Sequence, residues 1–281
     1  MKIGLPTTLF QENSFEEALK NVLKLKPDCV EIVFDLPHFL PEKEYEEVNI
    51  KKIKNIISQD NVECSVHSSF YEFNLGSVYP VRRKAALIQT KKCLKFASLI
   101  EAKVVTVHPG YCPFPHVKKL FEDAKKRFIE DLKECLKFAL DEGILLALEN
   151  IQSKYFFFYK LDDGLSFIRE MDGLGLTLDI GHAYISACEL GLKKPENHIA
   201  RIVERKLRNH IFHVHLHDNF GVKDNHLAPG DGKINFKPIV EALKKIGYDK
   251  QIIVEVWNPQ KPVSFGLKGL KMTKKLFNFP C

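Results

Sequence analysis

The chain of 281 residues lacks the features of a membrane-spanning or secreted protein. No stretch approaches the ~20 continuous apolar residues that a membrane-spanning helix requires. Met1 and Lys2 lead directly into IGLP, without the apolar core and cleavage site of a signal peptide. The seven cysteines are scattered and include no CxxC pair, so neither a disulfide framework nor a zinc knuckle is expected. We therefore expect a cytoplasmic protein with no membrane partner.

Nucleotide-binding signatures are also missing. Neither a glycine-rich dinucleotide fingerprint nor a P-loop follows any predicted strand. The net charge of +6, from 42 Lys and Arg against 36 Asp and Glu, permits an anionic ligand such as a sugar phosphate or a nucleic acid but does not require one. Much of the excess lies in amphipathic stretches such as 118–127, where a solvated helix face is the favoured explanation.

Short apolar runs alternate with longer amphipathic segments along the whole chain. The short runs predict strands at 2–6, 29–34, 63–67, 103–108, 144–150, 174–180, 211–216 and 251–256. A Ser-x-x-Glu capping box at Ser14 begins the first helix. Further helices are expected at 49–59, 81–100, 117–142, 162–171, 199–207, 236–246 and 263–277.

This alternation of strand and helix indicates a fold of the α/β class. Continuously apolar strands indicate a parallel sheet that is covered by helices. Eight repeats favour closure into a (β/α)₈ TIM barrel, a single domain over residues 1–281. An open doubly wound sheet is the alternative, but no nucleotide fingerprint supports it.

Chemistry-bearing residues gather where the predicted strands end. Reacting groups of a TIM barrel lie at the carboxyl ends of its strands and in the loops that follow. Nine side chains of metal-ligand type fall there: His67, His108, Glu149, Asp179, His182, His215, Asp224, His226 and Glu255. Each one alone has an ordinary structural explanation, and the alternating histidines of IFHVHLH (211–217) could form a polar strand face.

One bound divalent metal ion explains why these side chains gather at one rim better than a separate structural explanation for each of them. Buried carboxylates repel one another unless a cation or protons compensate them. Imidazole and carboxylate together suit an ion such as Zn²⁺ or Mn²⁺. We therefore expect one ion to be held by Glu149, Asp179, His215 and Glu255.

Four other features have weaker functional interpretations. Glu31 is expected to be a structural ion-pair partner in the barrel floor. The aromatic run YFFFY (155–159) could cover the site, contact another subunit or form plain core. Lys223 and Lys261 could hold a phosphate, but solvated lysines are the simpler explanation.

The motifs as a set resemble the AP endonuclease family 2 superfamily, the xylose isomerase-like TIM barrels. The resemblance covers essentially the whole chain. It rests on VEIVFD (30–35), SVHSSFYEFNLGS (65–77), VTVHPG (105–110), LALEN (146–150), LTLDIGHA (176–183), HVHLHDN with DNHLAPGDGKINF (213–236) and IIVEVW (252–257).

The epimerase branch of this superfamily, typified by D-tagatose 3-epimerase-like enzymes, implies a sugar isomerase or epimerase. Its metal ligands match Glu149, Asp179, His215 and Glu255, and the ion would be Mn²⁺, Co²⁺, Mg²⁺ or Zn²⁺. The substrate would be a ketose-type sugar or sugar phosphate. Glu149 and Glu255 would transfer its proton through a metal-stabilised enediolate. His182, together with His67 and His108, would contact the substrate. A homo-oligomer is compatible with this resemblance.

Endonuclease IV, a trinuclear zinc enzyme that cleaves DNA at abasic sites, is the alternative within the same superfamily. Its ligands match all nine rim residues, so that His67, His108, His182, Asp224 and His226 would be additional metal ligands. The loop LPHFLPEKE (36–44) lacks the cluster of basic and aromatic side chains with which that nuclease enters DNA. No arginine follows His215 where the epimerases contact substrate. A barrel that binds metal and ligand without turnover is a third hypothesis.

Overall fold

Eight parallel strands close into a barrel in the order β1 to β8, as the sequence predicts. The structure is a computed structural model that describes residues 1–39, 47–59 and 61–278. The strands are β1 (Lys2–Pro6), β2 (Cys29–Val33), β3 (Glu63–His67), β4 (Val104–Val107), β5 (Leu145–Glu149), β6 (Gly175–Asp179), β7 (Ile211–Leu216) and β8 (Gln251–Val254). β8 pairs with β1, with Ile3 opposite Ile252, so the barrel is closed and the fold is a TIM barrel of the α/β class.

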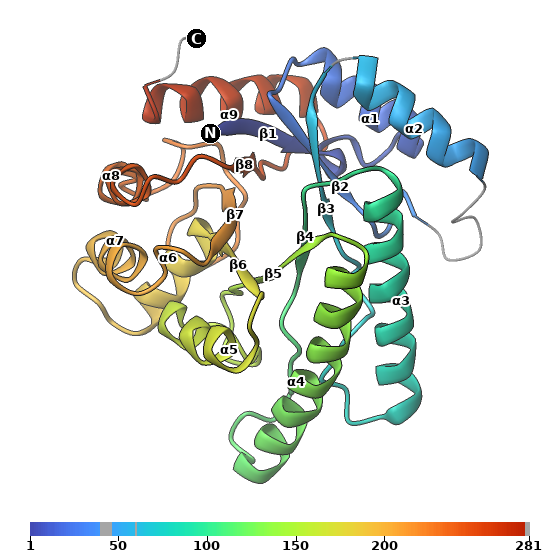
Figure 1. Cartoon of the computed structure of the whole chain (residues 1–281). Coiled ribbons are helices and arrows are strands. Elements are labelled where there is room, and N and C mark those ends of the chain that lie inside the picture. Colours follow the sequence, from blue (N-terminus) through green and yellow to red (C-terminus); the bar gives the residue numbers. More distant parts are fainter. Residues whose placement is uncertain (40–46, 60, 279–281) are drawn as a thin grey trace.

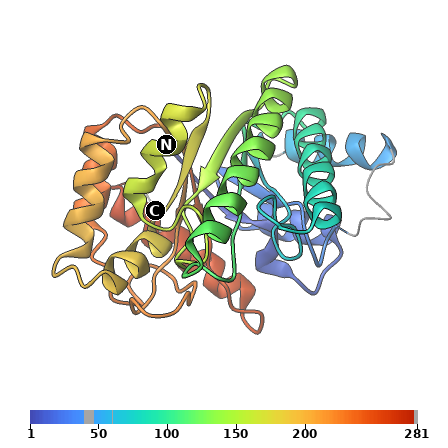
Figure 2. The ribbon, with the colours of Figure 1, turned by 90° about the horizontal axis from the view of Figure 1, so that it is seen from below.

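Helices surround the barrel on its outside (Figures 1 and 2). They are α1 (Phe15–Lys24), α2 (Glu47–Gln59), α3 (Pro80–Leu99), α4 (Lys118–Asp141), α5 (Gly164–Glu170), α6 (Ile180–Glu189), α7 (Pro195–Arg205), α8 (Lys237–Lys245) and α9 (Pro262–Leu276). Of the 3₁₀ helices in the described residues, η1 (Thr7–Phe10) follows β1, and η2 (Leu161–Asp163) precedes α5. The neighbours α3 and α4 lie side by side, as do α7 and α8.

The predicted capping box starts α1. The Ser14 side chain accepts the backbone N–H of Glu17, and the Glu17 carboxylate accepts the backbone N–H of Ser14. These two bonds satisfy amides that have no partner within the helix. Gly143 follows α4 with φ +71°, a left-handed conformation that a glycine adopts without strain.

One helix, α6, is missing from the prediction. Every residue from Ile180 to Ala187 is buried, so the segment has no polar face and no helical alternation that the sequence could reveal. Its N-cap is Asp179, whose side chain accepts the backbone N–H of His182. The last residue of β6 is therefore also the N-cap of α6, and this places His182 at the rim of the barrel.

The apolar core lies between the strands and the helices, where Phe34, Phe96, Phe128, Phe158 and Phe167 are fully buried. Cys29, Cys64, Cys112, Cys135 and Cys188 form no disulfide bond. The loop 36–44, which the sequence analysis compares with the nuclease, falls partly on residues 40–46, outside the described residues.

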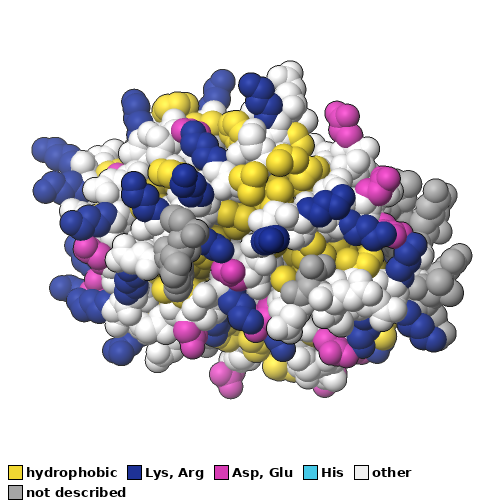
Figure 3. All heavy atoms as spheres, turned by 90° about the horizontal axis from the view of Figure 1, so that it is seen from above, with side chains coloured by type: hydrophobic (Ala, Val, Ile, Leu, Met, Phe, Trp, Pro, Cys, Tyr) yellow, Lys and Arg dark blue, Asp and Glu magenta, His cyan; other side chains and the backbone are white. Residues whose placement is uncertain are grey.

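The charged surface matches the expectation of solvated helix faces. On the face shown in Figure 3, Lys and Arg side chains are spaced among apolar patches and Asp and Glu, and the described residues there form no continuous basic stripe. On α4, Lys119 pairs with Asp123 at 3.4 Å. Among the described helices, none is long and apolar enough to cross a membrane.

Candidate metal centre and active site

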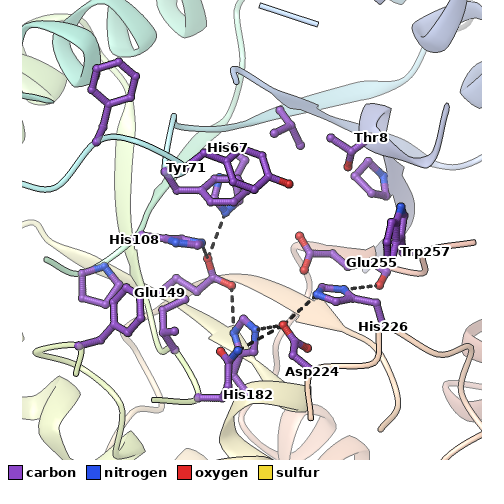
Figure 4. Close-up of a pocket in the computed structure, with 18 of the residues that line it drawn as sticks. Thr8, His67, Tyr71, His108, Glu149, His182, Asp224, His226, Glu255 and Trp257 are labelled. Carbon is purple, nitrogen blue, oxygen red and sulfur yellow. Dashed lines mark hydrogen bonds and ion pairs between the residues drawn. The ribbon is translucent and has the colours of Figure 1, made fainter. Parts of the chain in front are cut away.

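A pocket of about 560 Å³ lies at the carboxyl ends of the strands (Figure 4). Its floor is a cluster of side chains that could bind metal ions. Among the described residues the cluster contains five carboxylates and seven imidazoles: Glu31, Glu149, Asp179, Asp224, Glu255, His67, His108, His182, His213, His215, His217 and His226. All nine residues that the sequence predicts at the rim belong to this cluster.

The predicted ligand set forms the centre of the cluster. Glu149 ends β5, Asp179 ends β6, His215 lies on β7, and Glu255 follows β8. One donor atom from each lies within 4.8 Å of the others. His215 Nδ1 is 3.0 Å from Glu149 Oε1, 3.4 Å from Glu255 Oε1 and 4.0 Å from Asp179 Oδ2. We call these four residues the first donor group.

The first donor group suits a divalent cation. It offers three carboxylates and one imidazole, an oxygen-rich set that Mn²⁺, Mg²⁺, Co²⁺ and Zn²⁺ all accept. Asp179 is fully buried, and its Oδ2 has no hydrogen-bond partner. A buried carboxylate oxygen without a partner is costly, and a bound cation would remove that cost.

The orientation of His215 is set from below by Glu31. Glu31 is fully buried on β2 and lies 3.2 Å from His215 Nε2, on the side of the ring away from the first donor group. The same carboxylate accepts hydrogen bonds from His213 Nε2 at 2.9 Å and Ser65 Oγ at 3.1 Å. Glu31 is thus an ion-pair partner in the barrel floor, as expected, and it directs Nδ1 of His215 toward Glu149.

Two further histidines contact the other oxygen of Glu149. Nε2 of His67 and Nε2 of His108 both lie 3.1 Å from Glu149 Oε2. Because a carbonyl only accepts, His67 must donate its Nδ1–H to the backbone oxygen of Ser68 at 2.9 Å. Burial lowers the pKa of His67, but the hydrogen bond and charge of Glu149 outweigh it and raise the pKa to about 9. Burial lowers the pKa of His108.

The remaining rim residues meet on the other side of the pocket. Nε2 of His182 and Nε2 of His226 are each 3.1 Å from Asp224 Oδ2. His217 joins them, with its Nε2 3.4 Å from Asp224 Oδ1. We call His182, His217, Asp224 and His226 the second donor group. The sequence analysis treats His217 only as part of an alternating strand, although the alternation itself places it on the same face as His213 and His215.

The pKa values of Glu149 and Glu255, two of the carboxylates in the first donor group, are shifted in opposite directions. Burial alone would raise the pKa of Glu149, but the charges of His215 and His108 outweigh it and hold that pKa well below its usual range. For Glu255, burial dominates and raises the pKa. Figure 4 shows the two side chains reaching toward each other across the pocket. Paired carboxyl groups with divergent pKa values are typical of acid and base partners.

The walls of the pocket are aromatic and uncharged. They include Phe70, Tyr71, Phe73, Tyr111, Phe156 and Trp257, and no Lys or Arg lines the described part of the pocket. Lys223 and Lys261 are therefore not among the lining residues. Asp179 and His215 belong to the cluster but do not line the pocket, because both are fully buried.

The aromatic run 155–159 divides between the pocket and the core. Phe156 lines the pocket, and its main chain bridges to Tyr111. Phe157 and Phe158 are buried in the core, whereas Tyr155 is 45% exposed. One residue of the run thus covers the site, and two supply core packing.

Comparisons with known proteins connect this arrangement to a family. The model of the family described as xylose isomerase-like TIM barrel matches residues 19–276. The uncharacterised protein MJ1311 of Methanocaldococcus jannaschii is 33% identical, over 91% of this chain and 83% of its own length. A crystal structure of a D-tagatose 3-epimerase-like protein superposes with a TM-score of 0.82 at 30% identity, covering 99% of this chain and 98% of that chain. The probable endonuclease 4 of Halothermothrix orenii is 27% identical, over 85% of this chain and 88% of its length.

Proposed function

Because the chain belongs to the xylose isomerase-like TIM barrel family, we propose that it is a divalent-metal-dependent isomerase or epimerase of a ketose-type sugar or sugar phosphate. The observation that carries the proposal is the placement of Glu149 and Glu255 on facing sides of one pocket, with His215 Nδ1 between them at 3.0 and 3.4 Å. Similarity to the D-tagatose 3-epimerase-like structure supports it.

The first donor group, Glu149, Asp179, His215 and Glu255, would hold the metal ion. When bound, the ion would polarise the substrate carbonyl and acidify the neighbouring C–H. Mn²⁺, Co²⁺, Mg²⁺ and Zn²⁺ all suit the donors, and three carboxylates favour the harder ions.

Glu149 and Glu255 would perform the proton transfer. One carboxylate removes the proton from the carbon next to the carbonyl, and the substrate becomes an enediolate. The other returns a proton to that carbon from the opposite face, which gives the epimer. Return to the neighbouring carbon gives the isomer. In both cases the bond broken and the bond formed are C–H bonds, and no external oxidant or reductant is needed.

Other residues of the pocket would bind the sugar. His67, His108 and His182 line the pocket and can hydrogen-bond to substrate hydroxyl groups. The aromatic side chains, such as Trp257 and Tyr71, offer faces for the C–H side of a sugar ring. Because neither Lys nor Arg lines the described pocket, it favours a sugar without a phosphate group.

Exchange of substrate hydrogen with solvent tests the proposal. Metal-loaded protein is incubated with ketoses in D₂O, and NMR follows deuterium at the carbon next to the carbonyl. We expect exchange with at least one ketose, and about 10²- to 10⁴-fold slower exchange in Glu149→Gln and Glu255→Gln. Glu63→Gln, the same substitution at the amino end of β3, should exchange at the wild-type rate. Unchanged exchange in both pocket variants would refute their roles.

One observation favours a second function, an endonuclease IV-like trinuclear zinc AP endonuclease. Three donor groups lie together, and Glu149 is shared by the first group and by the pair of His67 and His108. The relative in Halothermothrix orenii supports this alternative. Its test is salt-sensitive binding and cleavage of duplex DNA that carries an abasic site. Cleavage that depends on about three zinc ions per chain would establish the nuclease and exclude the epimerase.

A further inference from the structure

The pocket opens to solvent between three exposed aromatic side chains. Tyr71, Trp257 and Tyr111 all line it, and they are 59%, 51% and 40% exposed. They come from the loops after β3, β8 and β4, and Figure 4 shows Tyr71 and Trp257 on opposite sides of the opening. We call these three side chains the mouth aromatics. Exposed apolar groups that gather around a pocket mark a surface that binds a ligand or a partner.

The backbone that carries the mouth aromatics is fixed by hydrogen bonds. The Asp35 carboxylate accepts the backbone N–H of Tyr71 at 3.0 Å. The Asn74 side chain donates to the carbonyl of Tyr111 at 2.9 Å and accepts the N–H of the same residue at 3.1 Å. The backbone N–H of Trp257 donates to a carbonyl of the loop after β7 at 3.0 Å. Rings that are positioned in advance lose little conformational freedom when a ligand packs on them, so they favour binding.

Further aromatic rings connect the mouth with the floor of the pocket. Phe70 packs on His108, with ring centroids 4.6 Å apart, and on Tyr71, with centroids 4.4 Å apart. Phe156 packs on Tyr111 at a centroid distance of 5.4 Å. One wall of the pocket is therefore aromatic from the histidines beside Glu149 to the solvent.

Hydrogen-bonding side chains are sparse beyond the metal-donor cluster. Outside that cluster and the aromatic residues, the polar side chains among the described lining residues are those of Thr8, Gln11 and Gln152. The mouth aromatics add one hydroxyl or N–H each, at the edge of a ring. A free ketose carries a hydroxyl on nearly every carbon, and each hydroxyl that leaves water needs a partner. The cluster can serve the carbonyl end of such a sugar, whereas the mouth suits an apolar group.

The volume of the pocket exceeds what one sugar fills. Even if each non-hydrogen atom of a ketohexose took the space of one water molecule in the liquid, ~30 Å³, the sugar would fill only about 360 Å³. The pocket has a volume of about 560 Å³, so about 200 Å³ remain for another group. An apolar cavity of about 150 Å³ is enough to bind benzene.

We propose that the substrate is a ketose that carries a flat apolar group, about the size of a benzene ring, at the end of the sugar remote from the carbonyl. The carbonyl end faces the first donor group, an orientation that rests on the proposed function, and the apolar group packs between Tyr71, Tyr111 and Trp257. A phosphate at the same end would find no Lys or Arg among the described lining residues.

Binding of matched ketoses to the metal-loaded full-length chain tests the proposal. Several 2-ketohexoses are compared, each as the free sugar, its 6-O-benzyl ether and its 6-phosphate. Trp257 is the single tryptophan of the chain, so its fluorescence reports occupation of the mouth, and calorimetry measures the affinity. We expect the benzyl ether of at least one ketose to bind about 10- to 100-fold more tightly than its free sugar, because a buried ring of this size leaves water. The 6-phosphates should bind no more tightly than the free sugars.

Substitutions at the mouth assign the effect to these rings. Tyr71→Ala and Tyr111→Ala each remove one ring, and each should reduce the affinity ratio of benzyl ether to free sugar about 2- to 10-fold. Tyr79→Ala is the matched control, because Tyr79 is 64% exposed but does not line the pocket. The control should keep the wild-type ratio.

Two results would overturn the proposal. One is a benzyl ether that binds no more tightly than the free sugar for every ketose, and the other is a wild-type affinity ratio in both Tyr71→Ala and Tyr111→Ala. Absence of a gain together with a dimer that Tyr71→Ala dissociates would assign the rings to a contact between two copies of the chain.

Hydrogen exchange in D₂O separates this proposal from the proposed function. Exchange of free ketoses without tighter binding of any benzyl ether would refute the apolar group and leave the proton transfer intact. Tighter binding of a benzyl ether without exchange in any ketose would refute the proton transfer and retain the mouth as the binding site of the apolar group.

Discussion

Replacing Glu31 by glutamine should weaken metal binding although Glu31 touches no metal in the proposed site. The buried carboxylate of Glu31 lies 3.2 Å from His215 Nε2, and Nδ1 of the same ring faces the first donor group. As an anion it only accepts, so it keeps the Nε2 proton of His215 in place, and Nδ1 is the nitrogen that loses its proton when a metal ion binds. Glutamine can turn its amide N–H toward His215, and the ring proton then moves to Nδ1, the atom needed for the metal.

The size of the effect follows from the position of Glu31 behind a ligand. Loss of the partner that orients a metal-binding histidine typically costs about 10- to 100-fold in metal affinity, or ~1.4–2.8 kcal/mol. The loss should fall on the first group. The second donor group, which would hold zinc under the endonuclease alternative, is oriented by the carbonyls of Asn150 and Glu255, so its zinc affinity should stay within about twofold of wild type.

Metal titration of the metal-free protein, with Mn²⁺ for the first group and Zn²⁺ for the second, measures both affinities. Ser65→Ala is the matched control, because it removes the 3.1 Å hydrogen bond to the other Glu31 oxygen, Oε2, and leaves the negative charge in place. The control should bind Mn²⁺ as the wild type does. Equal Mn²⁺ affinity in Glu31→Gln and wild type, or an equal loss in Ser65→Ala, would refute the reasoning.

Three further predictions concern the rest of the cluster. Asp218→Asn should destabilise the fold by about 3 kcal/mol in denaturant unfolding, since an amide cannot accept all four backbone N–H groups that the carboxylate accepts. Gly181→Ala should cost about 1–3 kcal/mol and release zinc from the second group, because the new methyl meets the His217 ring; wild-type zinc retention would contradict this. Metal-free protein should lose stability as pH rises from about 6.5 to about 9, because folding raises the pKa of His67 and His226 to about 9 and their stabilising protons are lost there; saturating zinc should flatten this profile.

The fold follows from the sequence because its strands and helices carry different periodicities. Of the eight strands, β1, β3 and β7 have the predicted bounds, and the other five are shorter by one or two residues. Their ends are set by pairing in the closed barrel, which apolar runs do not reveal. Helix α6 could not be predicted by amphipathicity, since it is buried on all sides.

The rim residues could be predicted, but their grouping could not. The carboxyl ends of parallel strands must meet on one rim, so Glu149, Asp179, His215 and Glu255 are expected to be neighbours. Which side of Glu149 faces His67, and whether His217 points toward Asp224, depends on the tilt and stagger of the barrel. Alternation along residues 211–217, at the end of which His217 follows β7, predicts three histidines on one face, and this is the signal that the sequence offers for His217.

Charge compensation connects these observations. Five carboxylates meet within the barrel mouth, and Glu31, Glu149 and Asp179 are almost completely buried. Without metal, protonated histidines are the counter-charges, which is why the pKa of His182 is raised to about 10 despite the opposing effect of burial. Metal ions bind the unprotonated form of the same imidazoles, so each ion that enters must displace protons. Metal affinity should therefore rise with pH until those histidines are deprotonated, and binding in a weakly buffered solution near pH 7 should release protons. A binding reaction without measurable proton release would show that the histidines are already neutral, and the buried carboxylates would then require another source of positive charge.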